Sequence, residues 1–120
     1  MSVKAFDGVF EMPVEGRSVK PRKTGVTMLI DKGLGLAATE DLLEIAGDCI
    51  DIIKLTFGTT AFMDMEIVSE KVDIISSYDV LTMPGGTFME VALWQGAYPR
   101  YLNPVAWRRE AVAAACRSID

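Results

Sequence analysis

The chain has 120 residues, 50% of them apolar, and a formal net charge of -5 with no histidine. This composition is that of a globular protein with one modest core, and it excludes an extensively disordered chain. The acidic balance argues against nucleic acid as a partner, because phosphate binding needs a concentrated positive face. The lack of histidine excludes Ser-His-Asp triads, Cys-His pairs and zinc sites built on histidine.

The two cysteines, Cys49 and Cys116, form neither a Cys-x-x-Cys pair nor a metal-binding spacing. The first residues lack the apolar segment of a signal peptide. No apolar run approaches the ~20 residues that a membrane-spanning helix needs. We therefore expect a cytoplasmic protein without a membrane partner, whose acid and base chemistry falls to Asp, Glu, Lys or Tyr.

The N-terminal residues 1–23 carry glycines and prolines with little periodicity, which predicts an irregular arm. The run from Val26 to Asp31 is rich in β-forming residues and predicts a strand. Alternate residues of a strand face opposite sides, so Thr27, Leu29 and Asp31 share one face. If the strand belongs to a barrel, we expect Asp31 to point inward at its tip.

A first helix is predicted from about Thr39 to Ala46, with Thr39 as its N-cap and Gly47 at the position after its C-terminus. Its predicted buried stripe consists of Leu42, Leu43, Ile45 and Ala46. A second strand-like run follows in residues 50–60.

Asp64 is the predicted N-cap of a second helix that ends at Ser77. Apolar residues recur at helical spacing along it: Met65, Val68, Val72 and Ile75. Its predicted polar face consists of Glu66, Glu70, Lys71 and Asp73. Residues 80–87 then form a third strand-like run.

A third helix is predicted from Thr87 to Gly96, beginning with a capping box of Thr87 and Glu90. Strand and helix thus alternate three times, which predicts an α/β fold with three parallel neighbouring strands. The pattern ends after Gly96; residues 106–120 predict an Ala/Arg-rich, helical tail, and no fourth strand is evident.

Polar and glycine residues follow each predicted strand, where α/β folds place their sites. Asp31 and Lys32 end the first strand, in what could equally be a solvated turn. Lys54 interrupts the apolar second strand. A lysine at this position needs a charged partner or an anionic ligand, unless its side chain reaches solvent from the strand end.

Backbone N–H groups and hydroxyls beside helix N-termini suit phosphate or carboxylate oxygens. Two segments offer them: Gly58-Thr59-Thr60 and Gly85-Gly86-Thr87. An ordinary tight turn between strand and helix explains their composition as well. These segments, with Lys54, predict a site for a small anionic ligand.

Four ordered blocks resemble the N-terminal part of the phosphosulfolactate synthase family. They read Lys20-Pro-Arg-Lys-Thr-Gly-Val-Thr, Ile30-Asp-Lys-Gly-Leu-Gly, Asp51-Ile-Ile-Lys-Leu-Thr-Phe-Gly-Thr and Pro84-Gly-Gly-Thr-Phe-Met-Glu. The resemblance spans residues 20–102. It implies a cytoplasmic, homo-oligomeric (β/α)8 barrel that adds sulfite to phosphoenolpyruvate with Mg2+. The product would be (2R)-phospho-3-sulfolactate, in coenzyme M and related sulfonate biosynthesis.

The resemblance also implies roles for the residues at the strand tips. Asp31 would be a catalytic residue and a magnesium ligand or its neighbour, and Lys54 would face the substrate carboxylate or sulfite. Arg22 or Lys32 would steer anions toward the site. Polar contacts to substrate would come from Gly58, Thr59, Gly85, Gly86 and Thr87.

A barrel of this kind takes about 250 residues, so the chain is expected to hold three of eight strand–helix units. It divides into the arm 1–23, family-like units at 24–103 and an atypical tail at 104–120 that indicates a truncated or frameshifted reading frame. We expect such a fragment to be inactive alone. A noncatalytic relative of the heat-stress-associated type and a self-associating anion-binding module are alternatives. Asp79 stands where the family tends to have glycine.

Overall fold

The computed structural model describes residues 3–11, 13, 18–56 and 58–97. Three strands alternate with three helices: β1 (Met28–Asp31), α1 (Leu36–Ala46), β2 (Ile52–Leu55), α2 (Met65–Ser77), β3 (Leu81–Pro84) and α3 (Gly86–Trp94). Two short 3-10 turns, η1 (Gly47–Cys49) and η2 (Thr59–Phe62), complete the order. The expectations for the tail, 104–120, lie outside the described residues.

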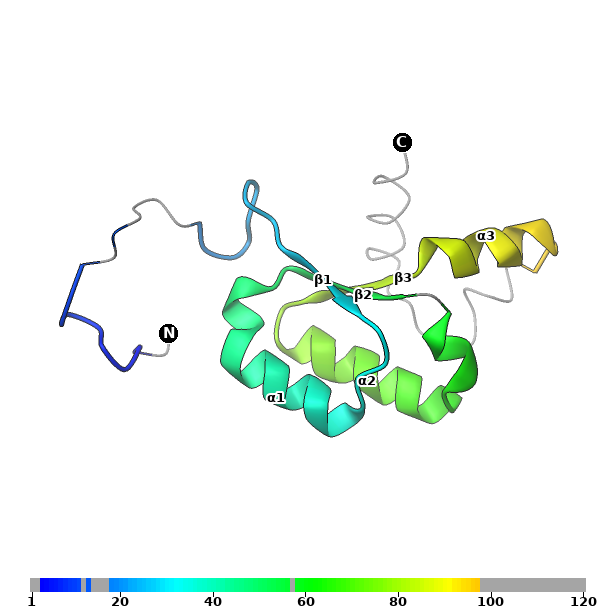
Figure 1. The fold of residues 1–120 in the computed structure, drawn as a ribbon, viewed down its shortest axis with the longest axis horizontal. Coiled ribbons are helices and arrows are strands. Elements are labelled where there is room, and N and C mark those ends of the chain that lie inside the picture. Colours follow the sequence, from blue (N-terminus) through cyan, green and yellow to red (C-terminus); the bar gives the residue numbers. More distant parts are fainter. Residues whose placement is uncertain (1–2, 12, 14–17, 57, 98–120) are drawn as a thin grey trace.

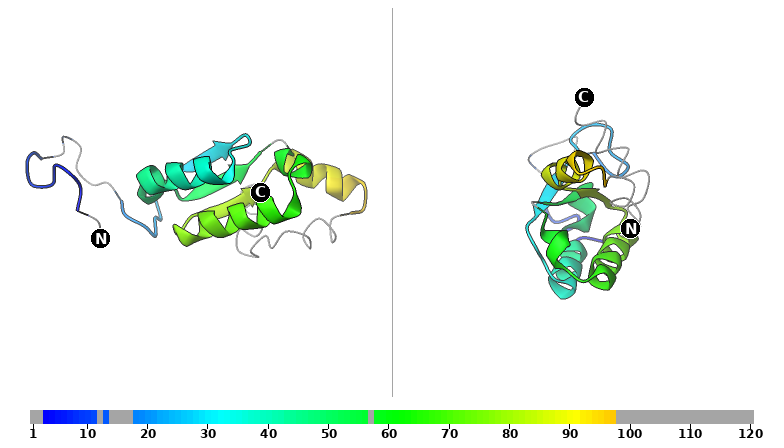
Figure 2. Two further views of the ribbon diagram at one scale, coloured as in Figure 1. Left: turned by 90° about the horizontal axis from the view of Figure 1, so that it is seen from below. Right: turned by 90° about the vertical axis from the view of Figure 1, so that its right-hand side faces the viewer.

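The three strands form one parallel sheet in the order β1-β2-β3, which confirms the predicted α/β arrangement. Helices α1 and α2 lie side by side on one face of the sheet, whereas α3 extends beyond the end of β3 (Figures 1 and 2). The right-handed connection rule for parallel strands accounts for both crossover helices lying on the same face. No helix in the described part is long and apolar enough to cross a lipid bilayer.

The core lies between the sheet and the pair α1 and α2. It consists of Leu43, Ile50, Ile53, Leu55, Val72, Ile75 and Val80. The strand residues that face it alternate with residues on the other face, as β geometry requires. On that other face Met28, Ile30 and Leu81 are 47%, 52% and 40% exposed. One face of the sheet is therefore packed, while the other, called here the open face, carries exposed apolar side chains.

Helix α1 begins at Leu36, earlier than predicted, and Thr39 is a buried residue within it. The prediction of Thr39 as N-cap is wrong because Gly35, with extended backbone, already starts the helix. The Thr39 hydroxyl instead donates a hydrogen bond to the Gly35 carbonyl at 2.8 Å. Ile45 was expected in the buried stripe but is 85% exposed.

Gly47 follows α1 with a φ of -55°, so it is not the left-handed residue that its predicted position implied. The chain continues from α1 into η1 without a reversal of handedness. A Cβ at Gly47 would lie 3.3 Å from Cδ1 of Tyr78. The close approach of Tyr78, and not the backbone conformation, therefore favours glycine here.

Asp79 has a φ of +56° and is the non-glycine residue with positive φ among the described residues. It closes the turn between α2 and β3, after α2 has ended at Ser77 as predicted. This conformation is unfavourable for L-residues because Cβ approaches the backbone, and Asp is among those that tolerate it best. The structure thus gives a physical reason for glycine at this position.

Helix α3 begins at Gly86, with Gly85 as its N-cap and no side-chain capping bond. The predicted capping box is wrong, because Thr87 and Glu90 both lie inside the helix. The helix therefore starts with two glycines, Gly85 as N-cap and Gly86 as its first residue, and has no side chain that caps its N-terminus.

Candidate functional site

The three strands end at the same level. Asp31, Leu55 and Pro84, their last residues, are neighbours in the sheet register. One further pairing extends the ladder past β2, since the amide and the hydroxyl of Thr56 both donate to the Asp31 carbonyl, at 3.0 and 3.1 Å. The residues that follow the strands, beginning with Lys32, Thr56 and Gly85, thus share one edge of the sheet.

Asp31 does not point to the open face. It is a register neighbour of Leu55, which lies in the core, and Asp31 itself is 2% exposed. The expectation that Asp31 points inward is therefore wrong, although its grouping with Leu29, which also packs on the core, is right. The strand's period of two fixes this outcome, because the core needs Leu29 and Asp31 must then face the helices as well.

The two oxygens of the Asp31 carboxylate differ in their partners: Oδ1 accepts hydrogen bonds, whereas Oδ2 is buried without a hydrogen bond and has an ion-pair contact. Its Oδ1 accepts hydrogen bonds from the amides of Gly33 at 2.7 Å and Leu34 at 2.9 Å. Its Oδ2 lies 2.6 Å from Nζ of Lys71, and both side chains are 1% exposed. The acid that ends β1 thus forms a buried ion pair with α2.

The prediction that Lys71 lies on the polar face of α2 is wrong. Its ammonium group is buried, and Nζ also donates to the Leu34 carbonyl at 2.5 Å. A signal existed in the sequence: Val68, Lys71, Val72 and Ile75 recur at the spacing of one helix face. A lysine at that spacing, opposite a strand-end aspartate, indicates a buried pair.

A magnesium ion does not fit Asp31 in this arrangement. Mg2+ is usually held by one or two carboxylates together with water and substrate oxygens. Both Asp31 oxygens already have partners, one of them a cation. In the described part of the chain, no three acidic or cysteine side chains converge in a way that could hold a metal ion.

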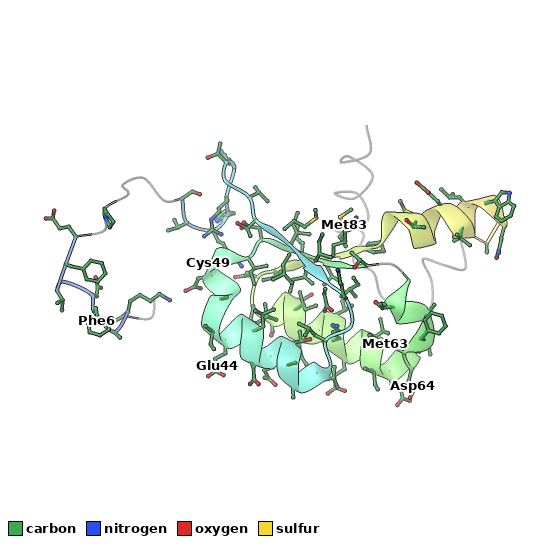
Figure 3. The ribbon with its side chains drawn as sticks, in the orientation of Figure 1. Phe6, Glu44, Cys49, Met63, Asp64 and Met83 are labelled. Atoms are coloured by element: carbon green, nitrogen blue, oxygen red, sulfur yellow. The ribbon has the colours of Figure 1, made fainter. Side chains whose placement is uncertain are left out.

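Lys54 lies on the open face. Its register neighbours are Ile30 on β1 and Met83 on β3, and Figure 3 shows Met83 on the side of the sheet away from α1 and α2. Lys54 is half-buried, and among the described residues its ammonium group has no hydrogen-bond or ion-pair partner. The structure therefore presents Lys54 as a cation between two apolar neighbours on the open face, Ile30, which is exposed, and Met83, which is buried.

After β2 the chain changes direction at Gly58. Its φ of +71° favours glycine, because a residue with a Cβ would be strained in this conformation. Thr59 then begins η2, and its hydroxyl donates to the Thr56 carbonyl at 3.0 Å. The Thr59 oxygen keeps its acceptor lone pairs but has used its donor. Gly58 and Thr59 thus follow the end of β2 closely, through the bond to Thr56.

The β3 tip leads directly into α3. A Cβ at Gly86 would meet no heavy atom within 4 Å, so packing does not explain the glycine. The first helical hydrogen bond runs from the Met89 amide to the Gly85 carbonyl, which leaves the N–H groups of Gly86 and Thr87 without intrahelical partners. This turn offers open space and backbone donors at a helix N-terminus.

Arg22 lies at the other end of the sheet. Its Nη1 donates to Oδ1 of Asp51 at 2.8 Å and its Nη2 to the Asp48 carbonyl at 2.7 Å. Asp51 precedes β2, and its Oδ2 accepts from the Thr27 amide at 2.8 Å, just before β1. Arg22 thus joins the amino ends of the strands. Its expected role in steering anions to the tips is corrected, because its guanidinium is committed to this structural pairing.

The same end of the sheet perturbs two pKa values. Burial by itself raises the pKa of Asp51, but the Thr27 amide and the Arg22 guanidinium outweigh it, so the pKa lies below its ordinary value. Burial lowers the pKa of Lys20, whose Nζ donates to the carbonyls of Tyr78 and Asp79 at 3.3 and 3.1 Å. The segment that carries Lys20 and Arg22 therefore connects residues that precede β2 with residues that precede β3, at the amino ends of the strands.

The predicted residues thus divide into three groups. Lys32, Gly58, Thr59 and the β3–α3 turn lie along the edge formed by the strand tips, with Lys54 on the open face beside it. Asp31 lies at the same edge but on the helix-covered face. Arg22 lies at the opposite end.

The chain is similar to a known family of proteins and to several of its members. The model of the family described as (2R)-phospho-3-sulfolactate synthase (ComA) matches residues 15–107. A phosphosulfolactate synthase of Methanothermobacter thermautotrophicus is 47% identical over 83 residues, which are 69% of this chain and 32% of that protein. The enzyme of the same name from Methanocaldococcus jannaschii is 38% identical over 84% of this chain and 37% of its own length.

A third relative, the phosphosulfolactate synthase of Bacillus subtilis, is 38% identical over 70% of this chain and 32% of its own length. The chain spans about a third of the length of the curated relatives it matches. The family match covers β1, β2, β3 and all three helices. The chain belongs to the phosphosulfolactate synthase family.

Proposed function

We propose that this chain carries part of the site of a carbon–sulfur lyase that adds sulfite to phosphoenolpyruvate, giving (2R)-phospho-3-sulfolactate. The relatives that bear the name phosphosulfolactate synthase support this reaction class. The proposal includes a (β/α)8 barrel in which the open face of the sheet lines the interior. Met28, Ile30 and Leu81, exposed here, would then be interior residues.

The observation that carries the proposal is the position of Lys54. It is a cation without a partner among the described residues, and it stands between Ile30 and Met83 on the open face. Apolar neighbours reduce the local dielectric, which strengthens the attraction between an ammonium group and an incoming anion. A half-buried lysine that has no partner among the described residues can be satisfied by an anionic substrate.

The proposed reaction develops negative charge where Lys54 could meet it. The sulfur lone pair of sulfite forms a bond to the methylene carbon of phosphoenolpyruvate, and the double-bond electrons move onto the neighbouring carbon and its carboxylate. A proton then adds to that neighbouring carbon. Lys54 would stabilise the charge on the carboxylate, which exists most strongly in the transition state.

Other residues along the edge would bind substrate without bond changes. The N–H groups of Gly86 and Thr87, which have no intrahelical partners at the N-terminus of α3, suit phosphate or carboxylate oxygens. Lys32 would attract the anions, with Gly58 and Thr59 as further polar contacts. The requirement for Mg2+ stays a proposal, and no step is assigned to the ion because Asp31 does not fit as its ligand.

Binding of phosphoenolpyruvate to the 120-residue chain tests this proposal. We expect amide resonances of Lys32, Lys54 and Gly86 to shift in an NMR titration, and the affinity to fall by roughly tenfold in Lys54→Met, the loss expected for one charge-assisted contact. Lys4→Met is the control, since Lys4 pairs with Asp48 on the exposed surface. An unchanged affinity in Lys54→Met would remove Lys54 from the site. Phosphorus NMR of a mixture with sulfite reports turnover, which we expect to be absent.

The open face supports a second candidate function, a small anion-binding module that completes its sheet by self-association. Its exposed apolar residues belong to β1 and β3, the two edge strands of the described sheet, and such edges are prone to pairing. Size-exclusion chromatography with thermal unfolding distinguishes the two. A compact oligomer that melts cooperatively supports the module, whereas a monomer or a loosely packed species supports an incomplete barrel.

A further inference from the structure

The buried ion pair between Asp31 and Lys71 has no part in the proposed binding of substrate. Replacing such a pair by apolar residues of similar volume is often neutral or stabilising, so stability alone is a weak explanation for it. What the pair does uniquely is fix geometry. It joins the end of β1 to α2, on the face of the sheet opposite Lys54.

The pair controls both ends of one short loop. Lys71 Nζ contacts Asp31 just before the loop and the carbonyl of Leu34, the last residue of the loop. Asp31 also holds the loop itself, because its Oδ1 accepts hydrogen bonds from the backbone amides of Gly33 and Leu34. Gly33, with a φ of +126°, supplies the one conformation in this turn that other residues rarely adopt.

Lys32 is the residue that this loop carries, and it is exposed. Its backbone position is set by Asp31 on one side and by Gly33 on the other. The amides of Gly33 and Leu34 are already satisfied by Asp31, so they are not available to a substrate. The contribution of this loop to anion binding is therefore the side chain of Lys32, in the place that the ion pair gives it.

We propose that Lys71 is a positioning residue for anionic substrates: it pins the loop of residues 32–34 so that Lys32 stands at the strand-tip edge beside Lys54. The inference rests on the proposed function, because it assigns Lys32 to the same site. Asp31 is then the inner anchor of the loop and not a ligand of metal or substrate.

The test uses the isotope-labelled 120-residue chain in three variants. Lys71→Met removes the ammonium group and keeps the volume. Asp31→Asn combined with Lys71→Met removes both charges, while the side-chain amide oxygen introduced at position 31 can still accept from the two backbone amides. This double variant protects the test against a single variant that does not fold. Val72→Ala, a core truncation on the same helix, is the control for a general loss of stability.

Two measurements are made on each: amide hydrogen exchange of Gly33 and Leu34, and the dissociation constant for sulfite and for phosphoenolpyruvate. In the double variant we expect exchange at both amides to accelerate by roughly tenfold and anion affinity to fall by roughly fivefold. Val72→Ala should change neither beyond its effect on global unfolding.

Unchanged exchange and unchanged affinity in a folded double variant would overturn the role of Lys71. Equal losses in Val72→Ala would also overturn it, because the effect would then be one of general stability. If the unmodified chain binds neither anion, the proposed function fails instead. In that case the exchange data still decide whether Lys71 pins the loop.

Discussion

Lys71 Nζ lies 2.6 Å from Oδ2 of Asp31, with both side chains 1% exposed. The contact joins the middle of α2 to the last residue of β1. It places a full ion pair on the face of the sheet that the helices cover, while the other lysine of the sheet region, Lys54, lies on the open face. Two lysines in neighbouring elements thus have different surroundings, one paired inside the fold and one on the open face.

Removing one member of this pair should be more harmful than removing both. Lys71→Met leaves the Asp31 carboxylate buried without its cation, which we expect to lower the free energy of unfolding by about 3–5 kcal/mol. The double variant with Asp31→Asn should recover most of that loss. Urea denaturation of the two variants measures both values. Equal destabilisation in the two would mean that the charge is not what makes Lys71 necessary.

The stability of the chain should depend on pH through Asp51. Its folded-state pKa lies below the ordinary value of 3.8, so it contributes stability that is present above pH 3.8 and is lost as the pH falls through the folded pKa. Asp51→Asn should lower the stability at neutral pH and flatten the acid limb of the profile. Thermal unfolding between about pH 2 and 7 checks this.

Arg22→Gln is the companion variant, because Arg22 pairs with Asp51 at 2.8 Å. It should shift the acid limb toward higher pH, since the Asp51 carboxylate would keep only its amide partner. A profile identical to that of the unmodified chain would show that the arginine does not hold the pKa down.

Asp79→Gly should stabilise the chain modestly. The φ of +56° at Asp79 costs an L-residue about 1–2 kcal/mol, and the greater freedom of glycine in the unfolded chain offsets about 0.5–1 kcal/mol of the gain. A net increase of several tenths of a kcal/mol is expected in urea denaturation. Ser77→Gly, at the end of α2, is the control and should destabilise. A loss of stability in Asp79→Gly would indicate that the Asp79 side chain contributes more than its backbone strain costs.

Gly86→Ala separates folding from binding at the β3–α3 turn. The added methyl meets no protein atom within 4 Å, so the melting temperature should not fall. The methyl would nevertheless occupy the space beside the N–H groups that lack intrahelical partners in α3, and we expect affinity for phosphoenolpyruvate to fall by roughly tenfold. A titration of Gly86→Ala beside the unmodified chain measures this. Unchanged affinity would place the phosphate elsewhere.

The order of the elements and the family follow from signals along the chain. Apolar runs that end in polar residues predicted three parallel strands, and the sheet has them in the expected order. The limits of α2, from Asp64 as N-cap to Ser77, also followed from local signals. Such features depend on neighbours along the chain, whose influence on backbone conformation is local.

The face that each charged residue occupies depends on contacts between distant parts of the chain. The alternation in β1 grouped Asp31 with Leu29 but could not say which side would be covered by helices. Lys71 shared the spacing of Val68 and Ile75, yet only the aspartate opposite it in space makes its burial tolerable. Arg22 went to the amino ends of the strands because Asp51 and Asp48 lie there. The free energy of a charge depends on partners distant in sequence, and the packing of α2 against the sheet brings Lys71 and Asp31 together.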